Sequence, residues 1–179
     1  MPVVTQTQYR EYRRLSQEAM EYCLGVLEEV DNEFSEVFGR GYGLVEAVET
    51  EDAELVLVTT ATITSTARTV LSHLRENGYK VGLVKIRVFR PFPTKALQRV
   101  LDSVPKIAVV DRNISLGREG IFCSELKAAL CHSSDQHQIQ GYLAGIGGTD
   151  VNPELIQHII EDALSREKVL DEPIWMMEE

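Results

Sequence analysis

The fold is decided by residues 80–113, KVGLVKIRVFRPFPTKALQRVLDSVPKIAVVDRN. An apolar, β-branched run at residues 81–88 leads into the corner RPFP at residues 90–93, and a short amphipathic segment follows. A second apolar run, residues 106–110, stops at the polar residues 111–113. Two apolar strands joined by a helix are typical of a parallel βαβ unit with both faces covered. The stretch therefore predicts an α/β protein.

The same alternation continues on both sides of this stretch. Apolar runs predict further strands at residues 54–60 and 139–143. Amphipathic spacing predicts helices at residues 62–77 and 121–130, and Asn152-Pro153 marks the start of another. Strands alternating with helices favour a mostly parallel open sheet, with helices on both faces and right-handed crossovers.

The two ends of the chain differ from this pattern. Residues 7–31 carry apolar side chains at steps of three and four, which predicts a long amphipathic helix. Because this helix precedes every predicted strand, we expect it to lie across the outside of the domain or against another chain. Residues 31–53 read as an irregular connector, and the apolar tail around Trp175, Met176 and Met177 is expected to dock on its own domain or on a partner.

These features give a three-part organisation. Residues 1–52 form the N-terminal helix and connector, residues 53–166 the α/β domain, and residues 167–179 the C-terminal tail. The GRGYG sequence inside the connector fits neither GxGxxG nor a Walker pattern, so we interpret it as a turn.

Composition and charge argue against several classes of function. The net charge is −10 and no basic cluster stands out, which disfavours nucleic acid as a partner. No apolar run reaches the roughly 20 residues that a membrane span needs, and no signal-peptide pattern opens the chain, so we expect a cytoplasmic protein. The three cysteines include no CxxC pair, and the four histidines stand apart, so no metal ligands are predicted.

Polar residues at the carboxyl ends of the strands are the candidates for function, because ligands of open α/β sheets bind there. Arginines beside the proline corner could bind an anion, or instead form a salt bridge to Asp111 or to a partner chain. The hydroxyl-rich turn at residues 59–66 reads as helix capping more than as an anion site. No nucleophile, base and orienting group occur together, so no catalytic, cofactor-binding or metal residue is assigned. The candidate subunit-interface residues are Arg87, Arg90, Phe92, Asp111, Arg112 and Asn113.

Three motifs carry a resemblance to a known family. They are residues 83–93 (LVKIRVFRPFP), residues 109–113 (VVDRN) with two glycines after them, and residues 145–151 (GIGGTDV). With them, the chain resembles the transketolase-C-terminal-like domain of the α subunit of 2-oxoacid:ferredoxin oxidoreductases, the pyruvate:ferredoxin oxidoreductase group. The segment at residues 18–40 is similar to the part that leads into this domain.

The resemblance implies an enzyme that decarboxylates a 2-oxoacid on thiamine diphosphate, passes electrons through iron–sulfur clusters to ferredoxin, and delivers the acyl group to coenzyme A. It places those cofactors on other modules and none in this chain. One departure concerns the turn after the first strand. The family usually has Gly-Ser there and another glycine a few residues on, whereas this chain has Ala61-Thr62 and Ser65, which hinders close backbone approach.

Two hypotheses follow. The first is a structural and assembly domain of such an oxidoreductase, inactive in isolation, oligomeric, associated with the other subunits and only indirectly with ferredoxin. The alternative is a stand-alone α/β module that binds an anionic metabolite or coenzyme A at the strand ends near Thr62, Arg90 and Arg112. An independent enzyme is the least favoured reading, because no residue set supplies nucleophile and base.

Overall fold

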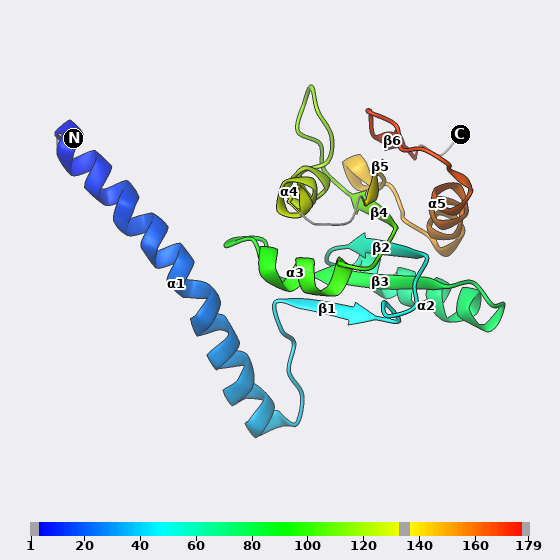
Figure 1. Ribbon diagram of the computed structural model, residues 1–179, viewed down its shortest axis with the longest axis horizontal. Coiled ribbons are helices and arrows are strands. Elements are labelled where there is room, and N and C mark those ends of the chain that lie inside the picture. Colours follow the sequence, from blue (N-terminus) through cyan, green and yellow to red (C-terminus); the bar gives the residue numbers. More distant parts are fainter. Residues whose placement is uncertain (1–3, 133–136, 177–179) are drawn as a thin grey trace.

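A computed structural model describes residues 4–132 and 137–176. It consists of one sheet between two helical layers, with a long helix that projects away from them (Figure 1). The strands follow the order β1-β3-β2-β4-β5-β6. Their bounds are β1 Val45–Val48, β2 Leu55–Thr59, β3 Val81–Ile86, β4 Lys106–Asp111, β5 Gln138–Leu143 and β6 Ile174–Trp175. The helices are α1 Gln6–Phe38, α2 Ile63–Glu76, α3 Thr94–Leu101, α4 Ile121–Leu130 and α5 Pro153–Ser165, with a 3-10 turn η1 at Ile146–Gly148.

The predicted α/β class is confirmed. Strands β2 to β6 pair in parallel, and β1 runs antiparallel to its neighbour β3. The expected strands and helices all occur, and most ends shift by one or two residues, but the first helix runs on to Phe38, beyond the predicted end at residue 31. Pro93 is the N-cap of α3, and the Arg90-Pro91 peptide bond at this corner is cis.

Both edge strands lie in segments that were not expected to contribute strands. The connector predicted at residues 31–53 contains the last turns of α1 and the four-residue strand β1. The tail contains β6, in which Ile174 pairs with Tyr142 and Trp175 with Leu143. Trp175 remains half exposed, Met176 packs against the core, and Met177 lies outside the described residues. The tail thus docks on its own domain.

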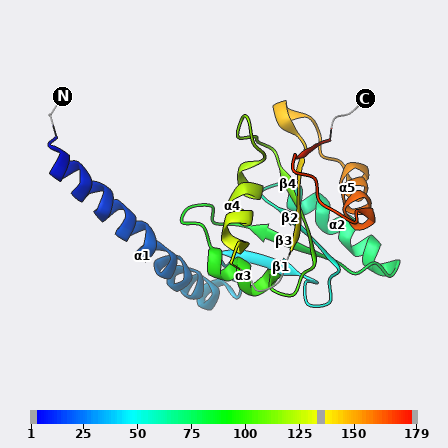
Figure 2. The same ribbon diagram turned by 45° about the horizontal axis from the view of Figure 1, so that its top comes forward.

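The sheet separates two apolar cores. Alternate side chains of β2 point to opposite faces, so that Leu55 and Leu57 belong to one core while Val56 and Val58 belong to the other. Helices α2 and α5 cover the first core, and α3 and α4 cover the second (Figure 2). This arrangement explains why the central strands read as continuous apolar runs.

The strand order creates a switch point between β2 and β4. The chain passes from β2 to β3 on one side and then returns to β4 on the other side. The loops that follow β2 and β4 consequently begin side by side and lead to α2 and α4, on opposite faces of the sheet. Crevices at such points are the usual ligand sites of open α/β sheets.

Helix α1 stands apart from both layers. A capping box between Thr5 and Gln8 begins it, and Gly39 in the left-handed conformation ends it. None of its residues, 6–38, is buried, and it extends into solvent from one corner of the domain (Figures 1 and 2). The Asp31 carboxylate accepts hydrogen bonds from the backbone N–H groups of Tyr42 and Gly43, which fixes the exit of the helix. In the described ranges, no helix has the length and apolar character to span a bilayer.

Candidate functional site

The junction between β4 and α4 is built around Asp111. This carboxylate is only 1% exposed and accepts hydrogen bonds from the N–H groups of Phe122 and Cys123, each at 3.0 Å. Asn113 donates to the same carboxylate at 3.2 Å, and its own side-chain oxygen accepts the N–H of Ile121 at 2.9 Å. Asp111 and Asn113 therefore satisfy the free N–H groups at the start of α4.

Gly120 makes this arrangement possible. A Cβ at this position would lie 2.1 Å from Oδ2 of Asp111, so only glycine allows the backbone to pass so close to the carboxylate. Burial raises the pKa of Asp111, and the three donated hydrogen bonds only partly oppose this effect. The hydrogen bonds that Asp111 accepts thus hold the junction together.

A second buried carboxylate, Glu119, supports the same junction from the loop. It accepts hydrogen bonds from Cys123 Sγ at 3.2 Å and Ser124 Oγ at 3.3 Å, and it pairs with Lys127 Nζ at 2.6 Å. Burial opposes its ionisation, yet the hydrogen bond from Lys127 and those from Cys123 and Ser124 lower its pKa. Burial also raises the pKa of the Cys123 thiol, the reverse of what an activated cysteine nucleophile needs.

The proline corner after β3 presents an exposed arginine on an aromatic cluster. Arg90 lies over the ring of Phe89 at 4.0 Å and pairs with Glu125 on α4. The Phe89 ring packs against Phe122 at 4.6 Å and edge-on to Phe92 at 6.4 Å. Arg90 keeps nearly half of its side chain exposed, so its guanidinium is oriented and still accessible.

Arg87 has an internal role instead. It pairs with Glu46 on β1 and lies 5.0 Å over the ring of Tyr42, while its Nε is buried without a hydrogen bond. Arg68 on α2 pairs with the same glutamate. Burial works against ionisation of Glu46, but the two arginines lower its pKa. Arg87 thus fastens the antiparallel edge strand to the sheet.

The junction between β2 and α2 is less complete. Thr62, the N-cap of α2, makes no side-chain capping bond, and its Oγ1 lies 3.5 Å from Nη1 of Arg112. In the described part of the chain, no carboxylate lies within 4.0 Å of the Arg112 guanidinium. Ala61 adopts a left-handed conformation with φ 49°, which a glycine would adopt without strain. Ala61, which stands where the family usually has glycine, is therefore in a strained conformation.

The six candidate residues separate into supporting and exposed groups. Asp111 and Asn113 meet at the start of α4, and Arg87 lies at the β1 edge. The prediction of a salt bridge from Arg87 or Arg90 to Asp111 was wrong. Arg87 pairs with Glu46 instead, and Arg90 pairs with Glu125. The exposed arginines are also apart: Arg90 reaches α4 and Arg112 reaches α2, on opposite sides of the sheet. The structure therefore does not bring Thr62, Arg90 and Arg112 into one site.

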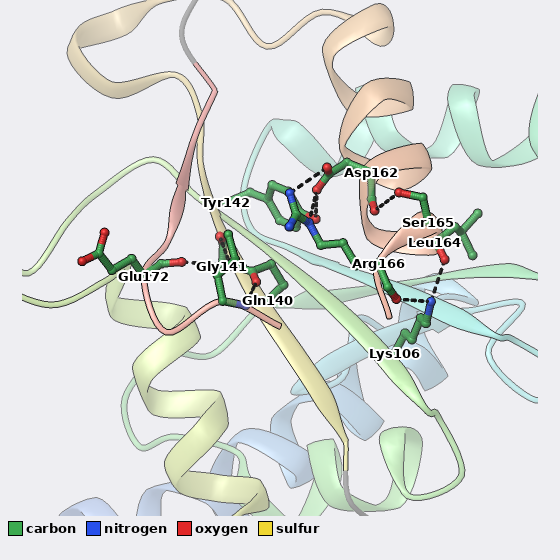
Figure 3. A network of polar contacts seen from close by, with 10 residues as sticks. Lys106, Gln140, Gly141, Tyr142, Asp162, Leu164, Ser165, Arg166 and Glu172 are labelled. Atoms are coloured by element: carbon green, nitrogen blue, oxygen red, sulfur yellow. Dashed lines mark hydrogen bonds and ion pairs between the residues drawn. The ribbon is translucent and has the colours of Figure 1, made fainter. Parts of the chain in front are cut away.

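A further polar cluster was not foreseen from the sequence. Tyr142 on β5 donates to Asp162 at 2.7 Å, and Arg166 binds the same carboxylate at 2.6 and 2.8 Å (Figure 3). Lys106 closes the end of α5 by donating to the carbonyl oxygens of Leu164 and Arg166. Burial opposes ionisation of Asp162, but its two donors lower its pKa, while burial raises the pKa of Tyr142. The four-residue spacing of Asp162 and Arg166 was the available signal.

The fold and these junctions define an α/β domain of the transketolase C-terminal kind. It is similar to a split-gene transketolase that forms an inactive β4 tetramer, with a TM-score of 0.50 and 14% identity over 67% of this chain and 42% of that chain. Residues 53–156 match the family described as Pyruvate:ferredoxin oxidoreductase core domain II. The chain belongs to this family, as its sequence motifs predicted.

Relatives across almost the whole chain agree. The pyruvate synthase subunit PorA of Thermotoga maritima is 40% identical over 94% of this chain and 43% of its own length. The ketoisovalerate oxidoreductase subunit VorA of Pyrococcus abyssi is 37% identical over 89% of this chain and 41% of its own length. A 2-oxoglutarate:ferredoxin oxidoreductase from Magnetococcus marinus shares the fold, with a TM-score of 0.55, 16% identity, and coverage of 92% of this chain and 24% of that chain. The chain thus spans less than half the length of these relatives.

The resemblance implies iron–sulfur clusters in the whole enzyme, and the cysteines of this chain do not fit such a group. Cys23 lies on α1, Cys123 is buried within α4, and Cys131 is exposed after the end of that helix. Among the described residues, no group of three or more histidine, cysteine or acidic side chains could hold a metal ion.

Proposed function

We propose that this chain is a structural and assembly domain of a thiamine-diphosphate-dependent 2-oxoacid:ferredoxin oxidoreductase. It associates with the other modules of the enzyme and supports the active site that they form. Thiamine diphosphate, iron–sulfur clusters and coenzyme A belong to those modules, and contact with ferredoxin is indirect. The proposed setting is the cytoplasm.

One observation carries this proposal: the match extends over nearly all of this chain but under half of PorA and VorA. The side-chain chemistry supports it. Asp111 and Glu119 are occupied by internal hydrogen bonds, and burial raises the pKa of the Cys123 thiol. Exposed Arg90 is instead arranged for contact, because a rigid corner holds it and the partly buried Phe92 at low entropic cost.

We assign the docking role to Arg90 and Arg112, which are exposed, together with Phe92, which is partly buried against the second core. Arg90 and Phe92 would contact other modules on the α4 side of the sheet and Arg112 on the α2 side, while Asp111, Asn113 and Arg87 hold the loops and strands that present them. Arginine and aromatic side chains are the residues that carry most binding energy at protein interfaces.

Reconstitution tests the assembly role. The full chain is mixed with the remaining subunits of its oxidoreductase, and complex formation is followed by light scattering together with enzyme activity. A stable complex whose activity depends on this chain is expected. A chain that stays separate, and whose omission leaves the activity unchanged, would contradict the proposal.

The β2–α2 junction favours one alternative function, the binding of an anionic metabolite or coenzyme A. Its basis is an α2 N-terminus without a side-chain cap beside Arg112, a residue without a carboxylate partner in the described ranges. A thermal-shift screen with coenzyme A, thiamine diphosphate and 2-oxoacids separates the two functions. A ligand at 100 times its dissociation constant would add about 2.7 kcal/mol of stability. The absence of a shift with all of them would remove this alternative.

A further inference from the structure

Helix α1 exposes a continuous apolar stripe. Eight of its large apolar side chains are between 39% and 74% exposed. Tyr9, Tyr12, Leu15, Tyr22, Val30 and Val37 lie on the stripe, and Met20 and Phe38 lie beside it. An isolated helix gains little stability from propensity alone and relies on packing of its apolar face. The stripe therefore indicates a surface that is covered by a protein partner.

The spacing of the stripe resembles that of a two-stranded coiled coil. From Tyr9 to Val37, the apolar positions 9, 12, 15, 19, 22, 26, 30, 34 and 37 follow one another in eight steps that cover 28 residues. The mean step is therefore about 3.5 residues, the repeat that keeps a seam facing another helix. A helix is thus the element that fits this surface.

The distribution of charge along α1 indicates which helix could pair with it. Residues 6–17 contain three arginines and one glutamate, whereas residues 18–38 contain seven acidic residues and no lysine or arginine. Arg14 is already paired with Glu11 and Glu18 of its own helix. Within the described ranges, Arg10 and Arg13 have no carboxylate within 4.0 Å. One end of the helix therefore carries free positive charge, and the other carries an excess of negative charge.

We propose that α1 pairs with α1 of a second copy of this chain in an antiparallel orientation. This orientation places the basic end of each helix against the acidic end of the other, twice by symmetry. Arg13 and Asp31 are eighteen residues apart, which is five helical turns, so both lie on the same flank of the stripe. A parallel pair would instead align the two acidic segments and repel. The self-complementary charge pattern selects the second copy as the occupant.

This inference does not depend on the proposed function. It concerns α1 alone, whereas the proposed docking edge lies at the carboxyl ends of β3 and β4. Helix α1 leaves the domain at one corner and has room for a partner along its exposed length (Figures 1 and 2). Reconstitution with other subunits could therefore fail while self-association succeeds, and the reverse.

Crosslinking of the full chain tests the orientation. Two variants, Tyr12→Cys and Val30→Cys, are made in a chain in which Cys23 and Cys131 are both replaced by serine. Besides the introduced cysteine, each variant then contains only the buried Cys123. Positions 12 and 30 lie on the same line of the stripe, near opposite ends of it. Antiparallel pairing predicts that a mixture of the two variants forms the mixed crosslink under mild oxidation in preference to either homodimer. Preferential homodimer crosslinks would show parallel pairing and overturn the proposal.

Sedimentation equilibrium tests the pairing itself. A dimer with a dissociation constant of about 10 μM is expected for the unmodified chain. Arg13→Glu should weaken it about tenfold, since two attractive contacts become repulsive. The matched control Arg118→Glu makes the same charge change on an exposed loop of the domain and should leave the constant unchanged. A chain that is monomeric at about 100 μM, or equal effects of both variants, would overturn the proposal, and the former result would assign the stripe to another protein.

Discussion

The two strand-to-helix junctions at the switch point begin side by side but are built differently. After β4, Asp111 and Asn113 satisfy the N–H groups at the start of α4, and Gly120 permits the close approach. After β2, Thr62 makes no capping bond to α2, and Ala61 holds a strained left-handed conformation. The first junction is closed by its own side chains, whereas the second leaves polar groups accessible to solvent or to another molecule.

This difference bears on function. A buried carboxyl group surrounded by donors stabilises a loop but has no free acceptor for a ligand. Asp111 and Asn113 of the Asp-Arg-Asn motif therefore have a structural role inside the domain. The exposed groups lie around it, with Arg112 at the open junction and Arg90 at the neighbouring corner. Such a division suits a domain that presents a fixed surface to other modules.

The largest expected effect comes from Gly120→Ala. The new Cβ would lie 2.1 Å from Asp111 Oδ2 and 2.2 Å from its Cγ, so either the carboxylate or the loop must move. Overpacking together with lost hydrogen bonds to a buried carboxyl group should cost about 3 kcal/mol of unfolding free energy. Urea denaturation monitored by circular dichroism measures it. Gly25→Ala, where the Cβ meets nothing within 4 Å, is the control and should not destabilise the domain.

A smaller loss is expected for Asp111→Asn, about 1 to 2 kcal/mol near neutral pH, because an amide offers one acceptor oxygen where the carboxylate offers two. Its pH dependence is informative. Burial raises the pKa of Asp111 in the folded protein, so its contribution to stability is present below the unfolded pKa and is lost as the pH rises through the folded pKa. The deficit of the variant should therefore be greater near pH 4 than near pH 7. A deficit that grows with rising pH would contradict this assignment.

At the β2–α2 junction, a change to glycine should stabilise the protein. Ala61→Gly removes the strain of φ 49° and should raise the unfolding free energy by about 1 kcal/mol. The matched control is Ala128→Gly, an exposed position inside α4, where the same exchange should lower it by a similar amount. If both variants lose stability, the strain assigned to Ala61 is not present.

The smallest effect on stability is expected for Arg112→Ala. Its side chain is exposed and, among the described residues, makes one long hydrogen bond, 3.5 Å to Thr62, so the unfolding free energy should change by less than about 0.5 kcal/mol. A loss above about 2 kcal/mol would mean that this junction is as closed as the other, and the comparison would fail.

The sequence predicted the fold well because apolar runs and helical spacing are local signals. The edge strands β1 and β6 were not predicted, because they have only four and two residues and lie in acidic or irregular segments. The site was harder to predict. Arg87 and Arg90 were recognised, but their partners lie 41 and 35 residues away, at Glu46 and Glu125.

Asp111 shows the limit of such reasoning. A charged residue at a strand end reads as a rim residue, and nothing in the local sequence states whether the side chain points outward or back into the protein. The glycine nine residues later, directly before α4, was the available indication, since it leaves space for the carboxylate. Only the tertiary structure connects the two positions.

The most direct test of the assembly role compares Arg90→Ala with Glu125→Ala. Both variants remove the exposed Arg90–Glu125 ion pair, so their urea midpoints should be similar. If Arg90 contacts another module, Arg90→Ala should weaken the complex with the remaining subunits about tenfold more than Glu125→Ala does, a difference of about 1.4 kcal/mol. Equal dissociation constants for the two variants and the unmodified chain would contradict the proposal that this corner docks the domain.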